Sequence, residues 1–228
     1  MIDIHSHILC GIDDGSRDIE ESVKMLKAAK EAGFEKIIAT PHVMRAGYDL
    51  DKTKKSFEML LPYAKEIGID IYQGYEYNCY ALSDDGFEGA MKFCTHQTKT
   101  ILLEFKSTVG FPTNWESIVM NFQREGAKVI IAHPERYIKT KLDFDKTKRS
   151  VEMGCKLQID GLNLFRKGFM NKTKRNAKKL IKSGLVSWIA TDAHCEKDYI
   201  EFGKAFKDKR NSRWFKPNKI EDYSAFYG

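Results

Sequence analysis

The chain has 228 residues, with 38 Lys and Arg against 32 Asp and Glu, a formal net charge of +6 and 42% hydrophobic residues. This length is typical of one large domain, and the composition excludes a disordered, collagen-like or coiled-coil protein. The apolar runs are far shorter than the roughly 20 residues that a membrane span needs, and the N-terminus does not resemble a secretory signal. We therefore expect a cytoplasmic protein without membrane insertion, built as a single domain over residues 1–228.

The charge distribution and the cysteine spacing further narrow the class of protein. Residues 1–114 carry 13 basic and 18 acidic side chains, whereas residues 115–228 carry 25 basic and 14 acidic side chains. The basic second half either has a different function from the acidic first half or binds an anionic ligand. The five cysteines are scattered without a CxxC pair, so neither a disulfide framework nor a zinc ribbon is expected.

Short β-branched runs recur about every 30 residues, which is the length of one strand and helix unit. Capping boxes at Asp18 and Thr113 predict helices that end at Gly33 and Gly126. Several runs are almost wholly apolar, as in parallel sheets buried on both faces, which favours a (β/α) barrel of seven units over an open sheet. We expect residues 196–228 to form a C-terminal helix and a tail that packs on the barrel. The seven predicted strands cover residues 2–4, 36–39, 69–72, 100–103, 128–131, 156–159 and 186–189.

Histidines and carboxylates gather at or after the predicted C-terminal ends of strands, where α/β folds place their functional sites. Taken alone, each has an ordinary structural explanation, but five of the six histidines share this placement, and only His96 does not. His plus carboxylate groupings are typical of divalent-metal sites. The predicted metal ligands are His5, His7, Asp14, His42, Glu76, Glu104, His133, Asp192 and His194.

This ligand set is too large for one ion with open positions, so it indicates two or three ions that share a bridging carboxylate. The set includes four carboxylates, and three divalent ions would leave a net charge of about +2. An anionic substrate such as a phosphate ester is therefore favoured.

In chain order, these motifs resemble the polymerase and histidinol phosphatase (PHP) superfamily. The resemblance runs from residue 1 to about residue 195, and the opening block around the His5-Ser6-His7 motif is its most specific part. More narrowly, the chain resembles the bacterial manganese-dependent protein-tyrosine phosphatases associated with capsular and exopolysaccharide synthesis. The matching blocks are residues 5–7, 11–15, 39–42, 76, 103–105, 132–137 and 191–194.

The resemblance implies a distorted, TIM-like (β/α)7 barrel and three divalent metal ions; manganese is expected, and iron or zinc also suits these ligands. It implies that Arg136 clamps the phosphoryl oxygens and that His42 and His194 belong to the catalytic machinery. The implied substrate is the phosphorylated, tyrosine-rich tail of a bacterial tyrosine kinase that regulates polysaccharide synthesis. The implied ligand sets are His5, His7, Glu76 and Asp192 for one metal, Glu76, Glu104 and His133 for the second, and Asp14, His42 and His194 for the third.

Two positions depart from the family pattern. Cys10 stands where the family usually has proline, which we interpret as a loop change without chemical consequence. After His194 the chain lacks the family's usual Asn and Arg, so a second phosphate contact falls to weaker candidates, Lys197 or Arg45.

We expect a metal-bound hydroxide to attack phosphorus in line, with no protein nucleophile. The leaving tyrosinate has a conjugate-acid pKa of about 10, so a proton from a site histidine is optional. A cysteine phosphatase needs Arg at a fixed offset after its Cys. Arg17 lies one residue too far from Cys10, and no other cysteine has the spacing.

Other functions stay open. Histidinol-phosphate phosphatase or another PHP phosphoesterase is the main alternative, and an amidohydrolase also begins with a His-x-His pair in a barrel. Residues 166–182 hold eight Lys and Arg and no acid, yet they fit the solvated face of an ordinary helix, so specific nucleic-acid binding is not expected. The oligomeric state is left open.

Overall fold

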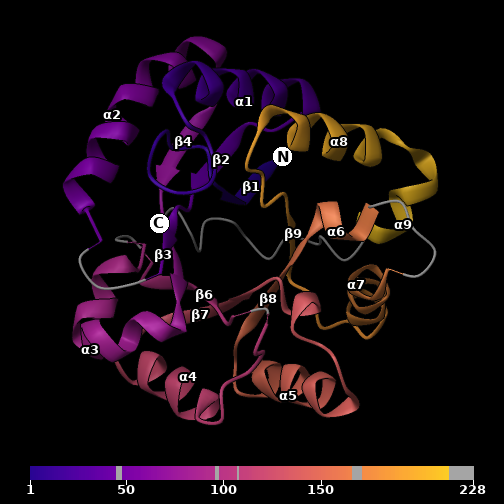
Figure 1. The fold of residues 1–228 in the computed structure, drawn as a ribbon. Coiled ribbons are helices and arrows are strands. Elements are labelled where there is room, and N and C mark those ends of the chain that lie inside the picture. The colour runs from indigo at the N-terminus through magenta and orange to yellow at the C-terminus, as the bar shows by residue number, and fades with distance from the viewer. Residues whose placement is uncertain (45–47, 96–97, 107, 166–170, 216–228) are drawn as a thin grey trace. The chain divides into compact units, whose positions relative to one another are not determined.

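The computed structural model describes residues 1–44, 48–95, 98–106, 108–165 and 171–215, which form helices and mostly parallel strands (Figure 1). The predicted α/β class is confirmed. The chain divides into two compact units, each described here through its described residues. Unit 1 comprises Met1–His42, Gly47–Tyr75 and Ala190–Phe215, and unit 2 comprises Val43–Ala46, Glu76–Ile189 and Lys216–Gly228.

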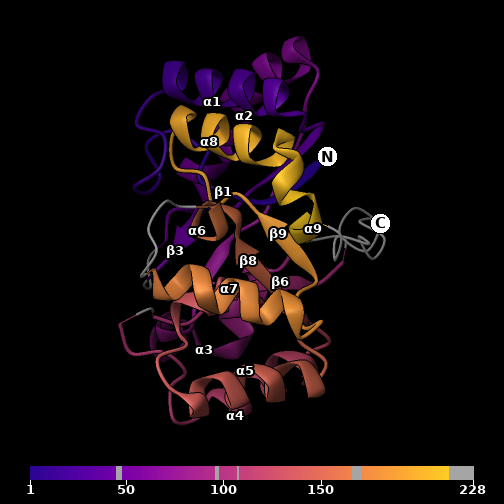
Figure 2. The ribbon, with the colours of Figure 1, turned by 90° about the vertical axis from the view of Figure 1, so that its right-hand side faces the viewer.

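Unit 1 contains a three-stranded parallel sheet in the order β1-β2-β4. Helix α1 packs against both α2 and α8 (Figure 2). The contact between α1 and α8 is close, because a Cβ added at Gly203 would lie 2.8 Å from Ala32 Cβ. The strands are β1 (Ile2–Ser6), β2 (Lys36–Ala39) and β4 (Asp70–Gln73), and the helices are α1 (Ile19–Ala32), α2 (Leu50–Ile67), α8 (Glu196–Lys207), the 3-10 turn η4 (Lys209–Asn211) and α9 (Ser212–Phe215).

Unit 2 is built on a six-stranded sheet in the order β3-β5-β6-β7-β8-β9. Helix α4 packs against β7 and α5 against β8. The strands are β3 (His42–Val43), β5 (Glu76–Asn78), β6 (Thr100–Glu104), β7 (Lys128–Ala132), β8 (Lys156–Asp160) and β9 (Trp188–Ala190). The helices are α3 (Leu82–Ala90), α4 (Trp115–Arg124), α5 (Lys141–Glu152), α6 (Gly161–Phe165) and α7 (Lys172–Lys182), with 3-10 turns η1 (Cys79–Ala81), η2 (Met91–Phe93) and η3 (Pro134–Arg136).

The core of unit 2 follows from the apolar runs in its strands. All five residues of β6 are buried, as are the last four of both β7 and β8. Strands buried on both faces need no alternation of apolar and polar side chains. The polar residues that do end these strands therefore have a reason other than solvation, and they include the predicted site residue Glu104.

All seven predicted strands are found, with bounds that shift by at most two residues. The predictions missed two short strands, β3 with two residues and β5 with three, neither of which has a β-branched run. Helix α1 begins and ends as predicted, since Asp18 accepts the Glu21 N–H at 2.8 Å and Gly33 adopts a left-handed φ of 99°.

The predicted capping box at Thr113 does not form, although α4 begins at Trp115, the first of the apolar residues expected to follow the box. Asn114 precedes the first helical residue, Trp115, and no side chain caps the helix. The chain instead enters the helix through a turn in which the Trp115 N–H donates to Pro112 O at 3.2 Å. A capping box in the sequence is therefore only a local preference that a neighbouring turn can override.

The packing of the C-terminal segment on a barrel stays a prediction. Helix α8 forms within residues 196–228, and it packs against α1, whereas residues 216–228 lie outside the described residues. The single-domain organisation stays a prediction. No helix among the described residues has both the length and the apolar composition to cross a membrane.

Candidate metal centre

The predicted ligands of unit 1 begin with His5 of β1, His7 directly after β1, and Asp192, which follows β9. His5 and His7 are fully buried, and their Nε2 atoms lie 3.1 Å apart. Asp192 Oδ1 lies 3.3 Å from His5 Nε2 and 3.1 Å from His7 Nε2. Side chains two residues apart on a strand point to the same face, so the His-x-His spacing explains why both rings reach one carboxylate.

Backbone pairing brings these two chain segments together. The His7 N–H donates to Ala193 O at 2.9 Å, and the Asp192 N–H donates to His5 O at 3.0 Å. Asp192 itself has a φ of +52°, in the left-handed region that non-glycine residues seldom occupy. Such strain persists only where surrounding contacts over-determine it, and it concentrates at functional sites.

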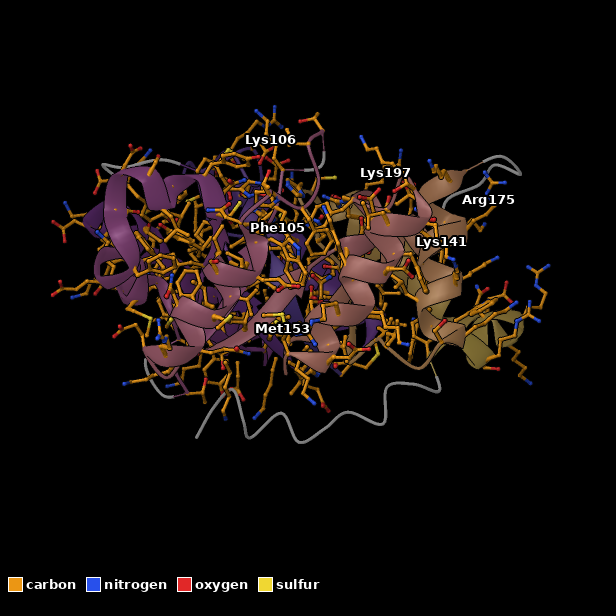
Figure 3. All side chains as sticks on the ribbon, turned by 90° about the horizontal axis from the view of Figure 1, so that it is seen from below. Phe105, Lys106, Lys141, Met153, Arg175 and Lys197 are labelled. Atoms are coloured by element: carbon orange, nitrogen blue, oxygen red, sulfur yellow. The ribbon has the colours of Figure 1, made fainter. Side chains whose placement is uncertain are left out.

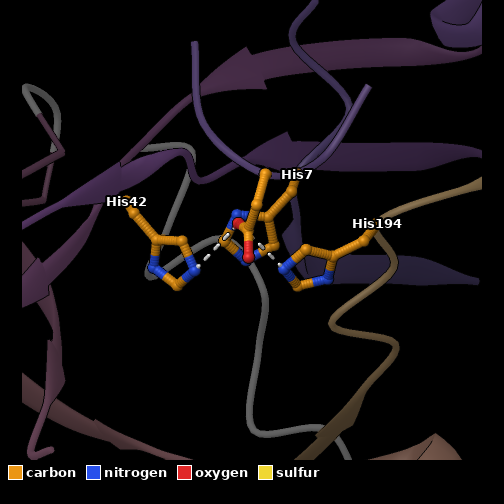
Figure 4. Close-up of side chains that lie close together, drawn as sticks. His7, His42 and His194 are labelled. Carbon is orange, nitrogen blue, oxygen red and sulfur yellow. Dashed lines mark ion pairs between the residues drawn. The ribbon is translucent and has the colours of Figure 1, made fainter. Parts of the chain in front are cut away.

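A second group in unit 1 comprises His7, Asp14, His42 and His194, whose ligand atoms all lie within 4.8 Å of one another. Figure 4 shows the three imidazole rings around one carboxylate, with dashed lines for two ion pairs. Asp14 Oδ1 lies 3.5 Å from His42 Nε2 and 3.5 Å from His194 Nε2. The structure thus brings together the predicted third ligand set and adds His7 to it.

The burial of this group is graded. His7 is buried, His42 and His194 are partly buried, and the Asp14 side chain is 72% exposed. A group that is closed on one side and open on the other can hold an ion and still admit a further ligand from solvent.

Asp13 is a contributor that the sequence reasoning passed over in favour of its neighbour Asp14. Asp13 Oδ2 lies 2.7 Å from His7 Nδ1 and accepts the His42 N–H at 2.9 Å. When Nδ1 of His7 donates to this carboxylate, the Nε2 lone pair is left for a metal. The adjacent Asp-Asp pair offered a signal, because one carboxylate can ligate while the other orients a ligand.

Gly15 allows the loop that carries these acids to lie against β1. A Cβ at this position would lie 2.1 Å from His7 O, which no real side chain tolerates. The Ser16 N–H also donates to His7 O at 3.1 Å. The glycine of the opening motif is thus required by close backbone approach.

The direction of the pKa shift differs among these groups. Burial by itself would lower the pKa of His7, but hydrogen bonds to Asp13 and Asp192 hold it well above its usual range. Burial works against the ionised form of Asp13, yet its contact with His7 lowers the Asp13 pKa to about 2. Burial, together with the charge on His7, lowers the pKa of His194. Anionic oxygens therefore surround a protonated His7 ring. A divalent cation could take the place of the ring proton.

Unit 2 contributes a buried carboxylate and a buried imidazole. Glu76 Oε1 lies 2.7 Å from His133 Nε2, and both residues are fully buried. His133 directly follows β7 and has a strained φ of +32°. The Tyr137 hydroxyl lies 3.3 Å from His133 Nδ1 and accepts the Phe105 N–H at 3.0 Å, so it orients the ring.

Glu76 does not simply follow the predicted strand at residues 69–72. It is the first residue of β5, a separate strand. Strand β5 pairs with β6 so that Asn78 lies opposite Glu104, and Asn78 Nδ2 donates to Glu104 Oε2 at 2.9 Å. Glu104 ends β6 as predicted, and beyond it Phe105 is buried while Lys106 is exposed (Figure 3).

Arg136 follows His133 by three residues, and its side chain is 30% exposed. Its Nη2 donates to Asp160 Oδ2 at 2.7 Å. Glu135, which is fully buried, accepts the Asp160 N–H at 3.0 Å. Burial and the charge of Asp160 raise the pKa of Glu135 to about 8. The sequence did not indicate that the arginine has a buried acidic partner, because Asp160 belongs to another strand.

One of the two weaker phosphate candidates, Lys197, lies among the described residues. Lys197 is 79% exposed, projects from the surface (Figure 3) and lies 3.7 Å from Glu201 on the next turn of α8. Arg45 lies outside the described residues, and so does His96, for which no metal role was expected.

The donors of both units suit divalent ions such as manganese, iron and zinc, because these bind imidazole nitrogens and carboxylate oxygens. The donor atoms of these residues therefore fit a site for divalent metal ions.

Comparison with known proteins agrees with this chemistry. Residues 1–200 match the family described as capsular polysaccharide synthesis, CpsB/CapC. CapC of Staphylococcus aureus is 31% identical over 199 residues, which cover 85% of this chain and 77% of CapC. YwqE of Bacillus subtilis, named a tyrosine-protein phosphatase, is 30% identical over 199 residues, with the same two coverages.

Solved structures show the same relationship. A crystal structure from work on YwqE of B. subtilis and CpsB of Streptococcus pneumoniae, described as metal-dependent tyrosine phosphatases, has a TM-score of 0.78 and 27% identity. The match covers 94% of this chain and 90% of that chain. A phosphotriesterase homology protein from Escherichia coli matches with a TM-score of 0.57 and 11% identity over 93% and 90% of the two chains, which is a likeness of fold alone.

Proposed function

Because this chain belongs to the CpsB/CapC family of capsular polysaccharide synthesis proteins, we propose that it is a metal-dependent tyrosine-protein phosphatase. The observation that carries the proposal is the group His7, Asp14, His42 and His194, whose ligand atoms lie within 4.8 Å of one another. The names of the relatives support the reaction class. The absence of an arginine at the required offset from any cysteine argues against a thiol nucleophile.

We propose three divalent ions, with manganese first among them. This number comes from the PHP resemblance and is supported by the amount of donor chemistry in the chain, since one ion cannot use nine ligands and keep an open position. The proposed ligands are His5, His7, Asp14, His42, Glu76, Glu104, His133, Asp192 and His194.

When bound, the metal ions would lower the pKa of water toward 7 and offset phosphoryl charge, with both effects on the order of several kcal/mol. Side chains of the protein would orient the metal ligands. Asp13 would hold His7 in the tautomer that presents Nε2, and the Tyr137 hydroxyl would orient His133.

Arg136 would bind the phosphoryl oxygens with the planar donor fork of its guanidinium group. Charge shifts among these oxygens as the ester bond breaks, so donors fixed in advance stabilise the transition state more than the ground state.

His42 and His194 would lie beside the reacting ester. His194 Nδ1 lies 2.9 Å from Asp192 O, so this nitrogen holds the ring proton and Nε2 faces Asp14. The leaving tyrosinate is a weak base with a conjugate-acid pKa of about 10. A proton from a site histidine would assist its departure without being required.

The proposed substrate is a phosphotyrosine protein, specifically the tyrosine-rich tail of a bacterial kinase that controls polysaccharide synthesis. The basic second half of the chain, with 25 basic against 14 acidic side chains over residues 115–228, supports an anionic partner. A cytoplasmic location stays a prediction.

Metal analysis of the purified protein, combined with assays on four substrates, tests the proposal. We expect manganese-stimulated hydrolysis of phosphotyrosine peptides, with much slower hydrolysis of phosphoserine peptides, histidinol phosphate and a cyclic amide. Faster hydrolysis of histidinol phosphate would favour the histidinol-phosphate phosphatase function. Hydrolysis of the cyclic amide alone would indicate an amidohydrolase, and activity that is unchanged after chelation would exclude a metal-dependent reaction.

A further inference from the structure

We propose that Asp160 is a positioning residue, which holds the Arg136 guanidinium in the orientation that binds a phosphoryl group. The inference rests on the proposed function, because it assigns a partner to the phosphate-binding arginine. It concerns unit 2 alone, in which both residues lie.

The register of the sheet explains why these two residues meet. Strand β8 runs parallel to β7 with Ala132 opposite Gln158. Asp160 ends β8, and η3, which carries Arg136, follows β7 after His133. The C-terminal ends of adjacent parallel strands lie at one edge of the sheet, so the acid and the base are delivered to the same edge.

The contact has the properties of an orienting pair. Arg136 Nη2 donates to Asp160 Oδ2 at 2.7 Å, and the Asp160 side chain is 2% exposed while the Arg136 side chain is 30% exposed. A buried carboxylate that binds one edge of the planar guanidinium fixes its plane. The exposed part of the side chain is then held in place, and less conformational entropy is lost when it binds an anion.

The aspartate is itself held on two sides. Asp160 Oδ1 accepts the Asn163 N–H at 3.1 Å, and the Asp160 N–H donates to Glu135 Oε1 at 3.0 Å. Asn176 Nδ2 of α7 donates to Glu135 O and to Ile138 O, at 3.0 and 2.8 Å, which ties α7 to the segment that carries Arg136. The position of the guanidinium is therefore set by a connected network.

Asp160 Oδ1 accepts from Asn163, and Asp160 Oδ2 accepts from Arg136. One substitution can therefore remove the second contact and keep the first. In Asp160→Asn, the remaining carbonyl oxygen can still accept the Asn163 N–H, whereas the new amide nitrogen cannot accept from Arg136. The turn into α6 is kept and Arg136 loses its contact with the Asp160 carboxylate.

A double-mutant cycle on hydrolysis of an aryl phosphate measures the effect. We expect Asp160→Asn to lower kcat/KM about tenfold in the wild-type background, and to change it by less than about twofold in the Arg136→Ala background. Effects that multiply in the double variant would show that Asp160 acts through the fold and would overturn the inference. Arg210 donates to Asp208 at 2.6 Å in an exposed pair, so Asp208→Asn is the matched control and should leave kcat/KM unchanged.

Chemical rescue adds a readout that a merely structural role would not produce. Free guanidinium should restore part of the activity of Arg136→Ala, because the Asp160 carboxylate can bind it, and should restore none in the Arg136→Ala, Asp160→Asn double variant. Equal rescue of both variants would contradict the inference.

A third measurement keeps the two proposals distinguishable. In ¹⁵N NMR spectra, the Arg136 Nε–H signal should be ordered in the wild-type protein and mobile in Asp160→Asn, with or without activity. An inactive wild-type protein would refute the proposed function, whereas an equally ordered Arg136 signal in Asp160→Asn would refute the positioning role.

Discussion

The two units supply different halves of the proposed chemistry. Unit 1 holds four of the five predicted histidine ligands, and its imidazoles lie against the carboxylates Asp13, Asp14 and Asp192. Unit 2 holds one histidine ligand, two buried glutamates and the arginine proposed to bind phosphate.

The way each unit orients its groups also differs. In unit 1, a charged carboxylate orients His7, whereas in unit 2 a neutral hydroxyl orients His133. An anionic partner raises the basicity of a ligating imidazole more than a hydroxyl does. We therefore expect metal affinity to depend more on the proposed ligands of unit 1 than on those of unit 2.

Loss of a ligand from either unit should have the largest effect. We expect His7→Ala and Glu104→Gln each to lower kcat/KM by at least about a thousandfold, because the metals supply several kcal/mol. Metal content should fall further in His7→Ala than in Glu104→Gln. Steady-state kinetics and elemental analysis of both proteins check this, with Glu116→Gln on the exposed face of α4 as control. Wild-type rates in either variant would remove that residue from the centre.

Asp13→Asn tests the anionic partner of unit 1. The amide can no longer serve as a charged acceptor for His7 Nδ1, so metal affinity should fall about 10- to 100-fold. Competition with a chelator measures the change. Asp18→Asn is the matched control, because asparagine is an equally good helix cap. An unchanged affinity in Asp13→Asn would mean that His7 needs no charged partner.

Substitution of two buried tyrosines, one in each unit, should have smaller effects than the loss of a ligand. The Tyr199 hydroxyl donates to Asp3 Oδ2 at 3.0 Å and lies 2.8 Å from Ser6 Oγ in unit 1, and the Tyr137 hydroxyl accepts the Phe105 N–H in unit 2. Tyr199→Phe and Tyr137→Phe should each lower the free energy of unfolding by about 1–3 kcal/mol, since both leave buried polar groups without a partner. Metal affinity should fall in Tyr137→Phe alone, because only that hydroxyl reaches a ligand ring. Urea unfolding and chelator competition separate the two effects, and equal metal affinities would contradict the role of Tyr137.

Alkylation of the buried cysteines should have the smallest effect on activity. Burial raises the pKa of Cys79 and of Cys155 to about 12 and that of Cys94 to about 11. At pH 8 these thiols are almost entirely protonated and should resist iodoacetamide. Alkylation of the native protein should therefore leave activity unchanged, and mass spectrometry should find no label on these three residues. Inactivation that follows labelling would reopen a thiol mechanism.

Much of the site could be predicted because of where polar residues fall in the strand pattern. Runs such as Lys128–Ala132 identify strands by their β-branched residues, and parallel strands deliver the residues after them to one edge. His133 and Glu104 could therefore be identified without coordinates. The His5-x-His7 pair could be placed on one face by the alternation of a strand.

What the sequence determined by itself was the series of strands and helices and the residue types at the strand ends, because both depend on local periodicity. Only the tertiary structure decided which groups become partners. Asp13 contacts His7 through a loop that folds back over Gly15, Glu76 begins its own strand, and Arg136 meets Asp160 across two neighbouring strands. These contacts depend on loop closure and sheet register, which join residues distant in the chain and leave no periodic trace in it.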